Sequence, residues 1–302
     1  MVSRALSGEQ WGIESGGHRA TIVEVGGGLR EYTVDGVPVV DSYHGDELCP
    51  GGAGQQLAPW PNRVGGGRYT FEGSEYQLAL TEPGAGNAIH GLVRWLPWRR
   101  TTGTPDSLTM SCELFAQPGY PWPLSLTTRW TVSRFGLRVE HTATNLADSP
   151  APFGFGCHPY LRLPGELDDW TLHLPAGKIL CTDDRSLPVG EKSAAGTELD
   201  FSTPRRIGDT VLDTAYTELG RGPSGTVDVT LTNLDGATVT LWADESFHWI
   251  QAFTGETLHA PRTRRALAVE PMTCPPDALR TGRDLLALAP GETWWAAWGI
   301  RA

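Results

Sequence analysis

Apolar and polar residues alternate along most of the chain with a period of two, the pattern of a strand that buries one face. Residues 126–132 alternate in this way, a turn follows at Phe135-Gly136, and residues 137–141 alternate again. Further strand patterns, several of them paired across turns that contain glycine, lie at residues 21–25, 32–34 and 37–40, 68–71 and 75–80, 227–231 and 239–241, and 293–300. We therefore expect antiparallel hairpins throughout the chain.

Helical periodicity is almost absent, and only residues 277–286 are expected to form short helical turns. The 302 residues include 37 glycines and 23 prolines, with no repeat, low-complexity tract or linker that would divide the chain. Together these features predict an all-β fold, a large antiparallel β-sandwich that forms one domain over residues 1–302.

One apolar run ends in a carboxylate. Residues 266–269 predict a buried strand, Glu270 follows, and Pro271 comes directly after it. Because proline cannot donate to a sheet ladder, we expect the strand to end at Glu270 and to hold the carboxylate at the mouth of the sheet. A buried glutamate is costly unless it is paired or takes part in chemistry. The alternative is a surface glutamate at a strand end.

Composition narrows the class of protein. A net charge of -11 argues against a general binder of nucleic acid or of anionic membranes. Residues 1–10 lack an apolar signal segment, and no run reaches the roughly 18 apolar residues of a membrane span, so we expect a cytoplasmic protein. Five widely spaced cysteines without a CxxC pair indicate neither a disulfide framework nor a zinc site, and we expect no metal and no cofactor.

The loops that interrupt the strands carry the unusual polar residues. Arg63 follows a proline-stiffened segment, so its guanidinium would be aimed at hydroxyls or a carboxylate, or would tie down loop carbonyls. His90 precedes a glycine, and His158 lies between glycines and a proline with aromatic residues on both sides. Two histidines in such loops favour a functional site over purely structural roles.

Two further polar residues lie in apolar surroundings. Asp213 follows an apolar pair, and Gln251 lies inside a strand-like apolar run. Each has a structural alternative, Asp213 as a turn residue and Gln251 as an outward-facing strand position. His141 is expected to be a strand residue.

The loop motifs resemble, in order, those of the aldose 1-epimerase (galactose mutarotase) family. They are Pro59-Trp60-Pro61-Asn62-Arg63, Ile89-His90-Gly91, Cys157-His158-Pro159-Tyr160, Leu212-Asp213 and Val269-Glu270-Pro271. The resemblance covers nearly the whole chain, and the family's large β-sandwich agrees with the strand pattern. After Tyr160 the chain continues Leu161-Arg162-Leu163, where typical members have a Phe-Asn-Leu type segment, which indicates a divergent bacterial member.

The resemblance implies a role for each matching residue. Glu270 would be the general base, His158 the general acid and His90 a second histidine near the reacting oxygens. The residues that would bind sugar hydroxyls are Asn62, Arg63, Asp213 and Gln251.

Interconversion of the two anomers of an aldose needs one base at the anomeric hydroxyl and one acid at the ring oxygen, with no metal. Desolvation should raise the pKa of Glu270, and its negative charge should help to keep His158 protonated.

Three other functions compete with an aldose 1-epimerase. A glycoside hydrolase normally has two carboxylates across the bond. A non-catalytic carbohydrate-binding protein needs no acid and base. A hexose-6-phosphate 1-epimerase needs a basic cluster, which these loops lack. We expect an epimerase that acts on an unphosphorylated aldose, as a monomer or homodimer, with no nucleic-acid or membrane partner.

Overall fold

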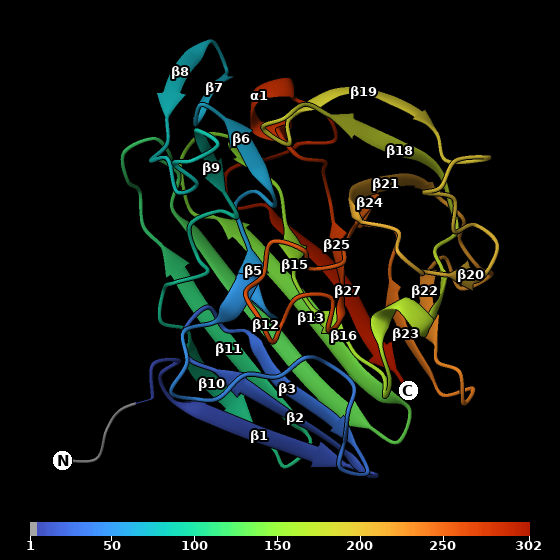
Figure 1. The fold of residues 1–302 in the computed structure, drawn as a ribbon. Helices are drawn as coiled ribbons and strands as arrows, with labels where there is room; N and C mark the ends of the chain where they lie inside the picture. Colours follow the sequence, from blue (N-terminus) through green and yellow to red (C-terminus); the bar gives the residue numbers. More distant parts are fainter. Residues whose placement is uncertain (1–4) are drawn as a thin grey trace.

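Two large antiparallel sheets dominate the computed structural model, which describes residues 5–302 (Figure 1). The first has nine strands, in the order β10 (Arg99–Gly103), β11 (Ser107–Leu114), β12 (Leu124–Ser133), β13 (Gly136–Asn145), β27 (Thr293–Arg301), β23 (Thr238–Ala243), β22 (Val227–Thr232), β17 (Thr171–His173) and β20 (Arg205–Arg206). The second has eight strands, β19 (Pro188–Ser193), β18 (Ala176–Thr182), β21 (Asp213–Leu219), β24 (Trp249–Phe253), β25 (Leu267–Met272), β15 (Gly156–Cys157) and β5 (Gln56–Leu57), with β16 (Tyr160–Leu161) also paired to β25.

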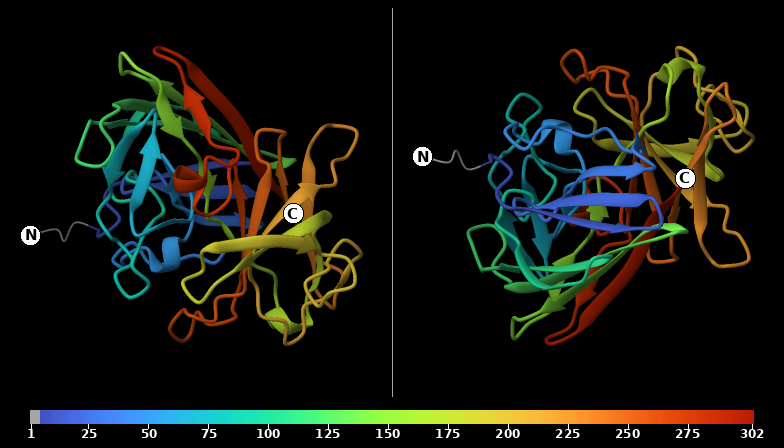
Figure 2. Two further views of the ribbon diagram at one scale, coloured as in Figure 1. Left: turned by 90° about the horizontal axis from the view of Figure 1, so that it is seen from above. Right: turned by 90° about the horizontal axis from the view of Figure 1, so that it is seen from below.

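Smaller elements cover the ends of these sheets. The N-terminal sheet of β1 (Gln10–Ser15), β2 (His18–Val23), β3 (Leu29–Val34) and β4 (Val37–Pro38) packs against β11, β12 and β13, as the two views along the vertical axis show (Figure 2). The remaining elements are β6 (Arg63–Gly65), β7 (Arg68–Phe71), β8 (Ser74–Gln77), β9 (Asn87–Ile89), β14 (Ala151–Phe153), β26 (Leu286–Leu288), the short 3-10 helices Pro50–Gly52 and Leu167–Asp169, and the single-turn helix α1 (Ala278–Thr281). The all-β prediction is confirmed, as is the short helical turn after residue 277.

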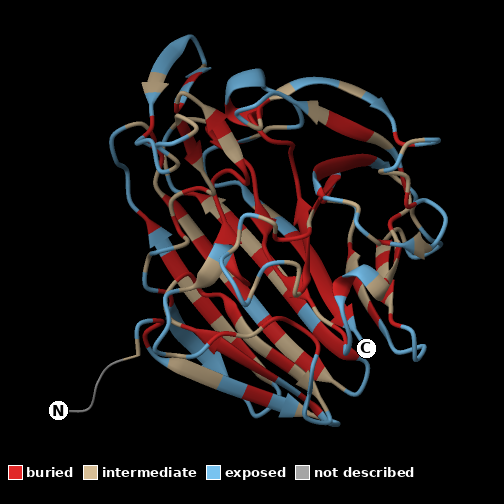
Figure 3. Cartoon of the chain, in the orientation of Figure 1, coloured by how far each residue is buried: buried red, intermediate tan, exposed pale blue. Residues whose placement is uncertain are grey.

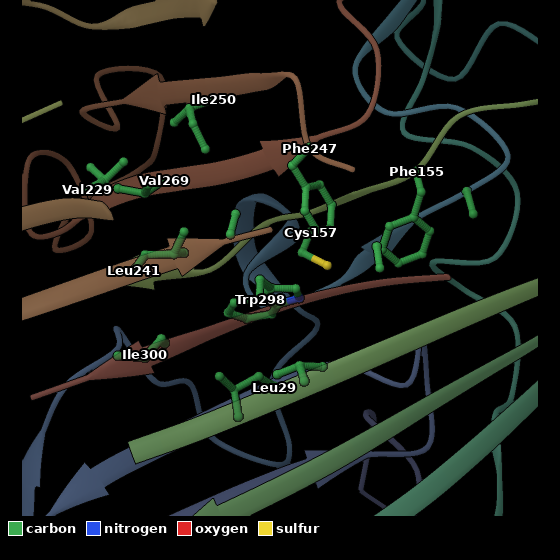
Figure 4. Close-up of a cluster of buried hydrophobic side chains, with 14 of the residues drawn as sticks. Leu29, Phe155, Cys157, Val229, Leu241, Phe247, Ile250, Val269, Trp298 and Ile300 are labelled. Atoms are coloured by element: carbon green, nitrogen blue, oxygen red, sulfur yellow. The ribbon is translucent and has the colours of Figure 1, made fainter. Parts of the chain in front are cut away.

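The period-two pattern of the sequence becomes the burial pattern of the strands (Figure 3). In β12 the inward positions include Leu126, Thr128 and Trp130, and in β13 they include Val139 and His141. These side chains face the eight-stranded sheet, whose Ile250 and Val269 lie in one apolar cluster with Trp298 of β27 (Figure 4). The main core therefore lies between the two large sheets.

Strand β25 is buried on both faces. Leu267 and Val269 point into the main core, while Ala268 and Met272, on the opposite face, belong to two smaller apolar clusters. Glu270 shares that second face, because alternate residues of a strand point the same way. The outer face of the eight-stranded sheet is thus where a buried carboxylate projects.

The prediction that this strand ends at Glu270 is wrong, since β25 continues through Pro271 to Met272. The N–H groups of Val269 and Thr273 donate to Pro159 and Phe155, so the nitrogen of Pro271 faces the same side between them. Opposite Pro271, the neighbouring chain passes from β15 to β16 through His158. The pairing of β25 with these two strands is therefore already interrupted there. Proline is tolerated there because no ladder bond is lost.

Candidate active site

A cavity of about 430 Å³ opens on the outer face of the eight-stranded sheet. All seven residues that the sequence singled out line it: Asn62, Arg63, His90, His158, Asp213, Gln251 and Glu270. They come from segments spread over more than two hundred positions of the chain, and the fold brings every one of them to the same cavity.

The register of three strands places three of these side chains together. Gln251 in β24 lies directly opposite Glu270 in β25, and Asp213 pairs with Phe253 at the start of β21. Residues at matching positions of neighbouring strands share a face, so the amide and both carboxylates project toward the cavity. Gln251 donates from Nε2 to Oδ1 of Asp213 at 2.6 Å. Asp213 therefore lies in a strand and not in a turn, and Gln251 is buried although it lies on the outer face of the sheet.

His158 lies in the gap between β15 and β16, and its backbone is held on both sides. Its N–H donates to the carbonyl of Gln55 at 3.1 Å, and its carbonyl accepts from the N–H of Gly54 at 2.8 Å. The imidazole stacks on Tyr160, with 4.9 Å between ring centroids, and meets the edge of His90 at 5.4 Å. The ring is therefore aimed by packing and by its backbone.

Asn62 and His90 lie at the end of the short β6–β9 ladder and bind each other. The N–H of Asn62 donates to Nδ1 of His90 at 3.3 Å, and the N–H of His90 donates to the carbonyl of Asn62 at 2.9 Å. Because Nδ1 of His90 accepts a hydrogen bond, its proton is on Nε2. Gly91 follows with φ +69°, and a Cβ there would lie 2.1 Å from the carbonyl oxygen of Ala58, so the His-Gly motif has a steric cause.

Arg63 forms a two-pronged ion pair with Glu82. Its Nε lies 3.0 Å from Oε2, and its Nη2 lies 3.0 Å from Oε1 of that carboxylate. Desolvation opposes the charge on Glu82, but the hydrogen bonds from Arg63 and Asn87 outweigh it and lower the pKa of this carboxyl group. The guanidinium of Arg63 is thus fixed in place at the lining of the cavity.

Glu270 and His158 form a buried pair at the floor of the cavity. The distance from Oε1 of Glu270 to Nε2 of His158 is 3.4 Å, and the two residues are only 2% and 4% exposed. Burial raises the pKa of Glu270 well above its ordinary value, with a further increase from Asp213. Burial, helped by the charge of Arg94, lowers the pKa of His158 to about 3.

These directions favour the neutral forms of both groups, so that the proton of the pair is placed on Glu270 rather than on His158. The expected rise in the pKa of Glu270 is confirmed in direction. The expectation that the carboxylate keeps His158 protonated is wrong for the free protein, because desolvation of the imidazole dominates. Desolvation also raises the pKa of Asp213, although this residue is exposed at the rim, and the charge of Asp213 adds to the rise in the pKa of Glu270.

Four buried polar atoms of residues that line the cavity have no hydrogen-bond partner among residues 5–302. They are Nδ1 of His158, Oε2 of Glu270, Oε1 of Gln251 and Nε of Arg94. Buried polar atoms are rarely left unpaired in folded proteins, because each costs desolvation energy of about 1–3 kcal/mol. The cavity therefore offers donors and acceptors to a polar ligand.

Comparisons with known proteins show the family to which the chain belongs. The family model described as aldose 1-epimerase matches residues 9–300. The chain belongs to the aldose 1-epimerase family. It is 34% identical to Uncharacterized protein YihR of Escherichia coli (strain K12), over 97% of this chain and 92% of that protein. It is 28% identical to Aldose 1-epimerase of Escherichia coli (strain K12), over 51% of this chain and 46% of that protein.

Solved structures of this family share the fold. The GalM/aldose epimerase homologue from C. elegans superposes with a TM-score of 0.86 at 19% identity, covering 97% of this chain and 98% of that chain. A putative aldose 1-epimerase from Escherichia coli K12 gives a TM-score of 0.83 at 22% identity, covering 97% and 98%. The mutarotase-like β-sandwich predicted from the sequence is confirmed.

The sequence reading of this epimerase-family cavity missed Glu82 and Arg94 and gave Tyr160 no role, although all three line it. Tyr160 could have been found, because it lies two residues after His158 in a motif already singled out. Arg94 follows the His90 loop closely, but nothing in its neighbours distinguishes it from a surface arginine. Nothing in the sequence around Glu82 indicates its role, because that role depends on an ion pair with Arg63, nineteen positions away.

Two findings bear on the expected partners. Among residues 5–302, no three His, Cys, Asp or Glu side chains gather in a way that would hold a metal ion. Within the same residues, no helix has the length and apolar character needed to cross a membrane. The segment of residues 1–10 that was examined for a signal sequence lies partly outside the described residues, since these begin at residue 5.

Proposed function

We propose that this protein is an aldose 1-epimerase that interconverts the α and β anomers of an unphosphorylated aldose by opening and closing the ring. The observation that supports this most is the buried pair of Glu270 and His158, 3.4 Å apart, with an unpaired atom on each group. A carboxyl and an imidazole that share one proton are the acid and base that the reaction requires.

In the reactive form, Glu270 is a carboxylate and His158 an imidazolium. Glu270 removes the proton of the anomeric hydroxyl, the C1–O5 bond breaks as the C1=O1 bond forms, and His158 gives its proton to O5. This step leaves a carboxyl group, a neutral imidazole and an open-chain aldehyde. After rotation about C1–C2, the same transfers run backwards on the other face, so no proton is consumed.

Burial favours one of the two proton distributions that occur in this cycle. Low polarity around the pair favours the neutral forms of both groups, and these are the forms present with the open-chain aldehyde. The protein thereby stabilises the proton distribution of the intermediate. The same desolvation makes Glu270 a stronger base once it has lost its proton. Each such group typically contributes about 10²–10⁴ in rate.

The other cavity residues would hold the sugar. His90, with Nε2–H as a donor, lies beside the imidazole of His158 and would contact the reacting oxygens. Hydroxyl groups would bind the remaining polar atoms, which belong to Asn62, Arg63, Asp213 and Gln251. Gln251 supports this role, because its amide oxygen is buried and has no hydrogen-bond partner within residues 5–302.

Unphosphorylated substrates are favoured by the charges of the cavity. Arg63 is already paired with Glu82, Arg94 is the other guanidinium that lines the cavity, and the carboxyl groups of Glu82, Asp213 and Glu270 outnumber the two arginines. We expect free aldoses to have a higher kcat/KM than their 6-phosphates, and a strong preference for glucose 6-phosphate would overturn the substrate class. We expect a cytoplasmic enzyme that is a monomer or homodimer.

Polarimetry tests the proposal. The purified protein should speed the decay of optical rotation of a fresh α-aldose to the ordinary equilibrium value. A panel of α-D-glucose, α-D-galactose, L-arabinose and D-xylose would identify the preferred sugar. Sugar binding without acceleration for any of them would favour a non-catalytic carbohydrate-binding protein instead.

A further inference from the structure

A second polar cluster lies behind the cavity, in the main core between the two sheets. Trp298 donates from Nε1 to Nε2 of His141 at 2.8 Å, and Nδ1 of His141 lies 2.9 Å from Oγ1 of Thr128. Thr128 donates to Oε1 of Gln56 at 2.7 Å, and Nε2 of Gln56 donates to the carbonyl of Gly27 at 2.9 Å. We call these four side chains the core network. All are at most 1% exposed.

The proton positions in the core network follow from its chemistry. An indole N–H only donates, so Nε2 of His141 accepts and the proton of the imidazole is on Nδ1. Nδ1–H then donates to Thr128, whose own hydroxyl proton goes to Gln56. Burial lowers the pKa of His141 to about 3, so the ring stays neutral. Every bond of the chain runs in one direction, from Trp298 to Gly27.

The core network connects the nine-stranded sheet to the strands that hold His158. His141 and Thr128 lie on the neighbouring strands β13 and β12, while Gln56 lies in β5 opposite Cys157 of β15. The two residues before Gln56 are those that bind the backbone of His158, through the carbonyl of Gln55 and the N–H of Gly54. The network thus fixes the segment on which the backbone of His158 rests.

This connection matters because the ring of His158 has few polar restraints of its own. Its Nδ1 has no partner among residues 5–302, and its Nε2 is 3.4 Å from Glu270, longer than an ordinary hydrogen bond. Catalytic imidazoles are commonly oriented by a hydrogen bond at the second ring nitrogen. In this protein the imidazole of His158 is oriented by stacking on Tyr160 and by the two hydrogen bonds of its backbone.

We propose that the core network of Gln56, Thr128, His141 and Trp298 is a positioning device that aims His158 through residues 54–56. The inference rests on the proposed function, since it assigns the network to the same acid group. Its members touch no substrate, so they act only through the placement of the imidazole. A misplacement of about 1 Å in a reacting group can cost about 10² in rate, so an intact network is worth a measurable part of kcat.

Thr128→Val tests this role, because it keeps the shape of the side chain and removes the hydroxyl that links His141 to Gln56. We expect kcat for the best aldose to fall about tenfold, with KM within about twofold of wild type. Thr128→Ser restores the hydroxyl and should recover kcat to within about twofold. Tyr69→Phe is the matched control, since it removes a buried hydroxyl that donates to the carbonyl of Gly119, outside the cavity and the network. It should lose stability but keep kcat.

Equal losses of kcat in Thr128→Val and Tyr69→Phe would overturn the proposal, as would a Thr128→Val protein with unchanged kcat. The second measurement needs neither the variant nor activity. Nitrogen-15 NMR of the wild-type protein should show His141 with its proton on Nδ1 across about pH 6 to 8. A proton on Nε2 would contradict the network. Absence of mutarotation in wild type would refute the proposed function and leave this tautomer result intact.

Discussion

The two buried histidines of the large sheets, His141 and His158, differ in how their nitrogens are satisfied. Burial lowers the pKa of each to about 3. Both nitrogens of His141 have partners, at 2.8 and 2.9 Å. His158 has an unpaired Nδ1 and a carboxyl oxygen 3.4 Å from Nε2. Burial is common to both, so it does not mark the functional residue; unsatisfied polar atoms beside a cavity do.

The comparison also separates stability from function. A closed hydrogen-bond network rigidifies a core, whereas a cluster with unpaired buried atoms costs stability that ligand binding recovers. Variants of the two clusters should therefore fail in different ways, and the largest difference should appear in catalysis.

Glu270→Gln and His158→Asn should each lower kcat by roughly 10² or more, with the fold and sugar affinity largely kept. The double variant should be little worse than the more damaged single variant, because the two groups act as a unit. Polarimetric progress curves across sugar concentration give kcat and KM. Activity of Glu270→Gln within a few-fold of wild type would show that Glu270 only binds hydroxyls.

The pH profile of kcat/KM tests whether Glu270 and His158 together hold one proton. Activity should be level around neutral pH, since the pKa of His158 is depressed to about 3 and that of Glu270 is raised. At acid pH the pair gains a second proton and loses its base. At alkaline pH it loses its only proton and with it the acid. Each limb should approach a tenfold change per pH unit. An acid limb centred near pH 6.5 would show that His158 titrates as an ordinary imidazole instead.

Chelation should have the smallest effect. Activity should survive exhaustive EDTA treatment followed by desalting, because the proposed mechanism uses proton transfer alone. Loss of activity on chelation, with recovery after one divalent ion is added, would mean that the histidines of the cavity have been misassigned.

Much of the fold could be read from the sequence because hairpin signals are local. Period-two alternation and glycine turns predicted β12, β13, β22 and β23, and the motif residues all reach one cavity. The extent of β25 was mispredicted because tolerance of Pro271 depends on a gap in the neighbouring strand.

The pairings behind the site were not predictable for a related reason. Glu82 meets Arg63, and Thr128 meets Gln56 seventy-two positions away, only through the assembled sheets. A threonine in an alternating strand looks like any other strand residue. Its place in a buried network is a property of the neighbours that the fold supplies.

Burial disfavours the ionised form of Glu270 in the folded protein, and this lowers the free energy of unfolding where the unfolded chain would ionise. Between the ordinary pKa of 4.5 and the raised value, the native carboxyl keeps its proton while the unfolded chain loses it. Each pH unit in that window therefore costs wild type about 1.4 kcal/mol of unfolding free energy, and Glu270→Gln avoids this cost.

Urea unfolding of wild type and Glu270→Gln at about pH 5 and about pH 7 measures this cost directly. We predict that Glu270→Gln is the more stable protein at the higher pH, and that its advantage shrinks by more than about 1 kcal/mol at the lower pH. Glu82→Gln is the control and should not be more stable than wild type at the higher pH. This substitution removes a carboxylate whose ionised form is stabilised by Arg63. A Glu270→Gln protein that is less stable than wild type at both pH values would contradict the account, since it would mean that Glu270 is ionised and stabilising in the folded protein.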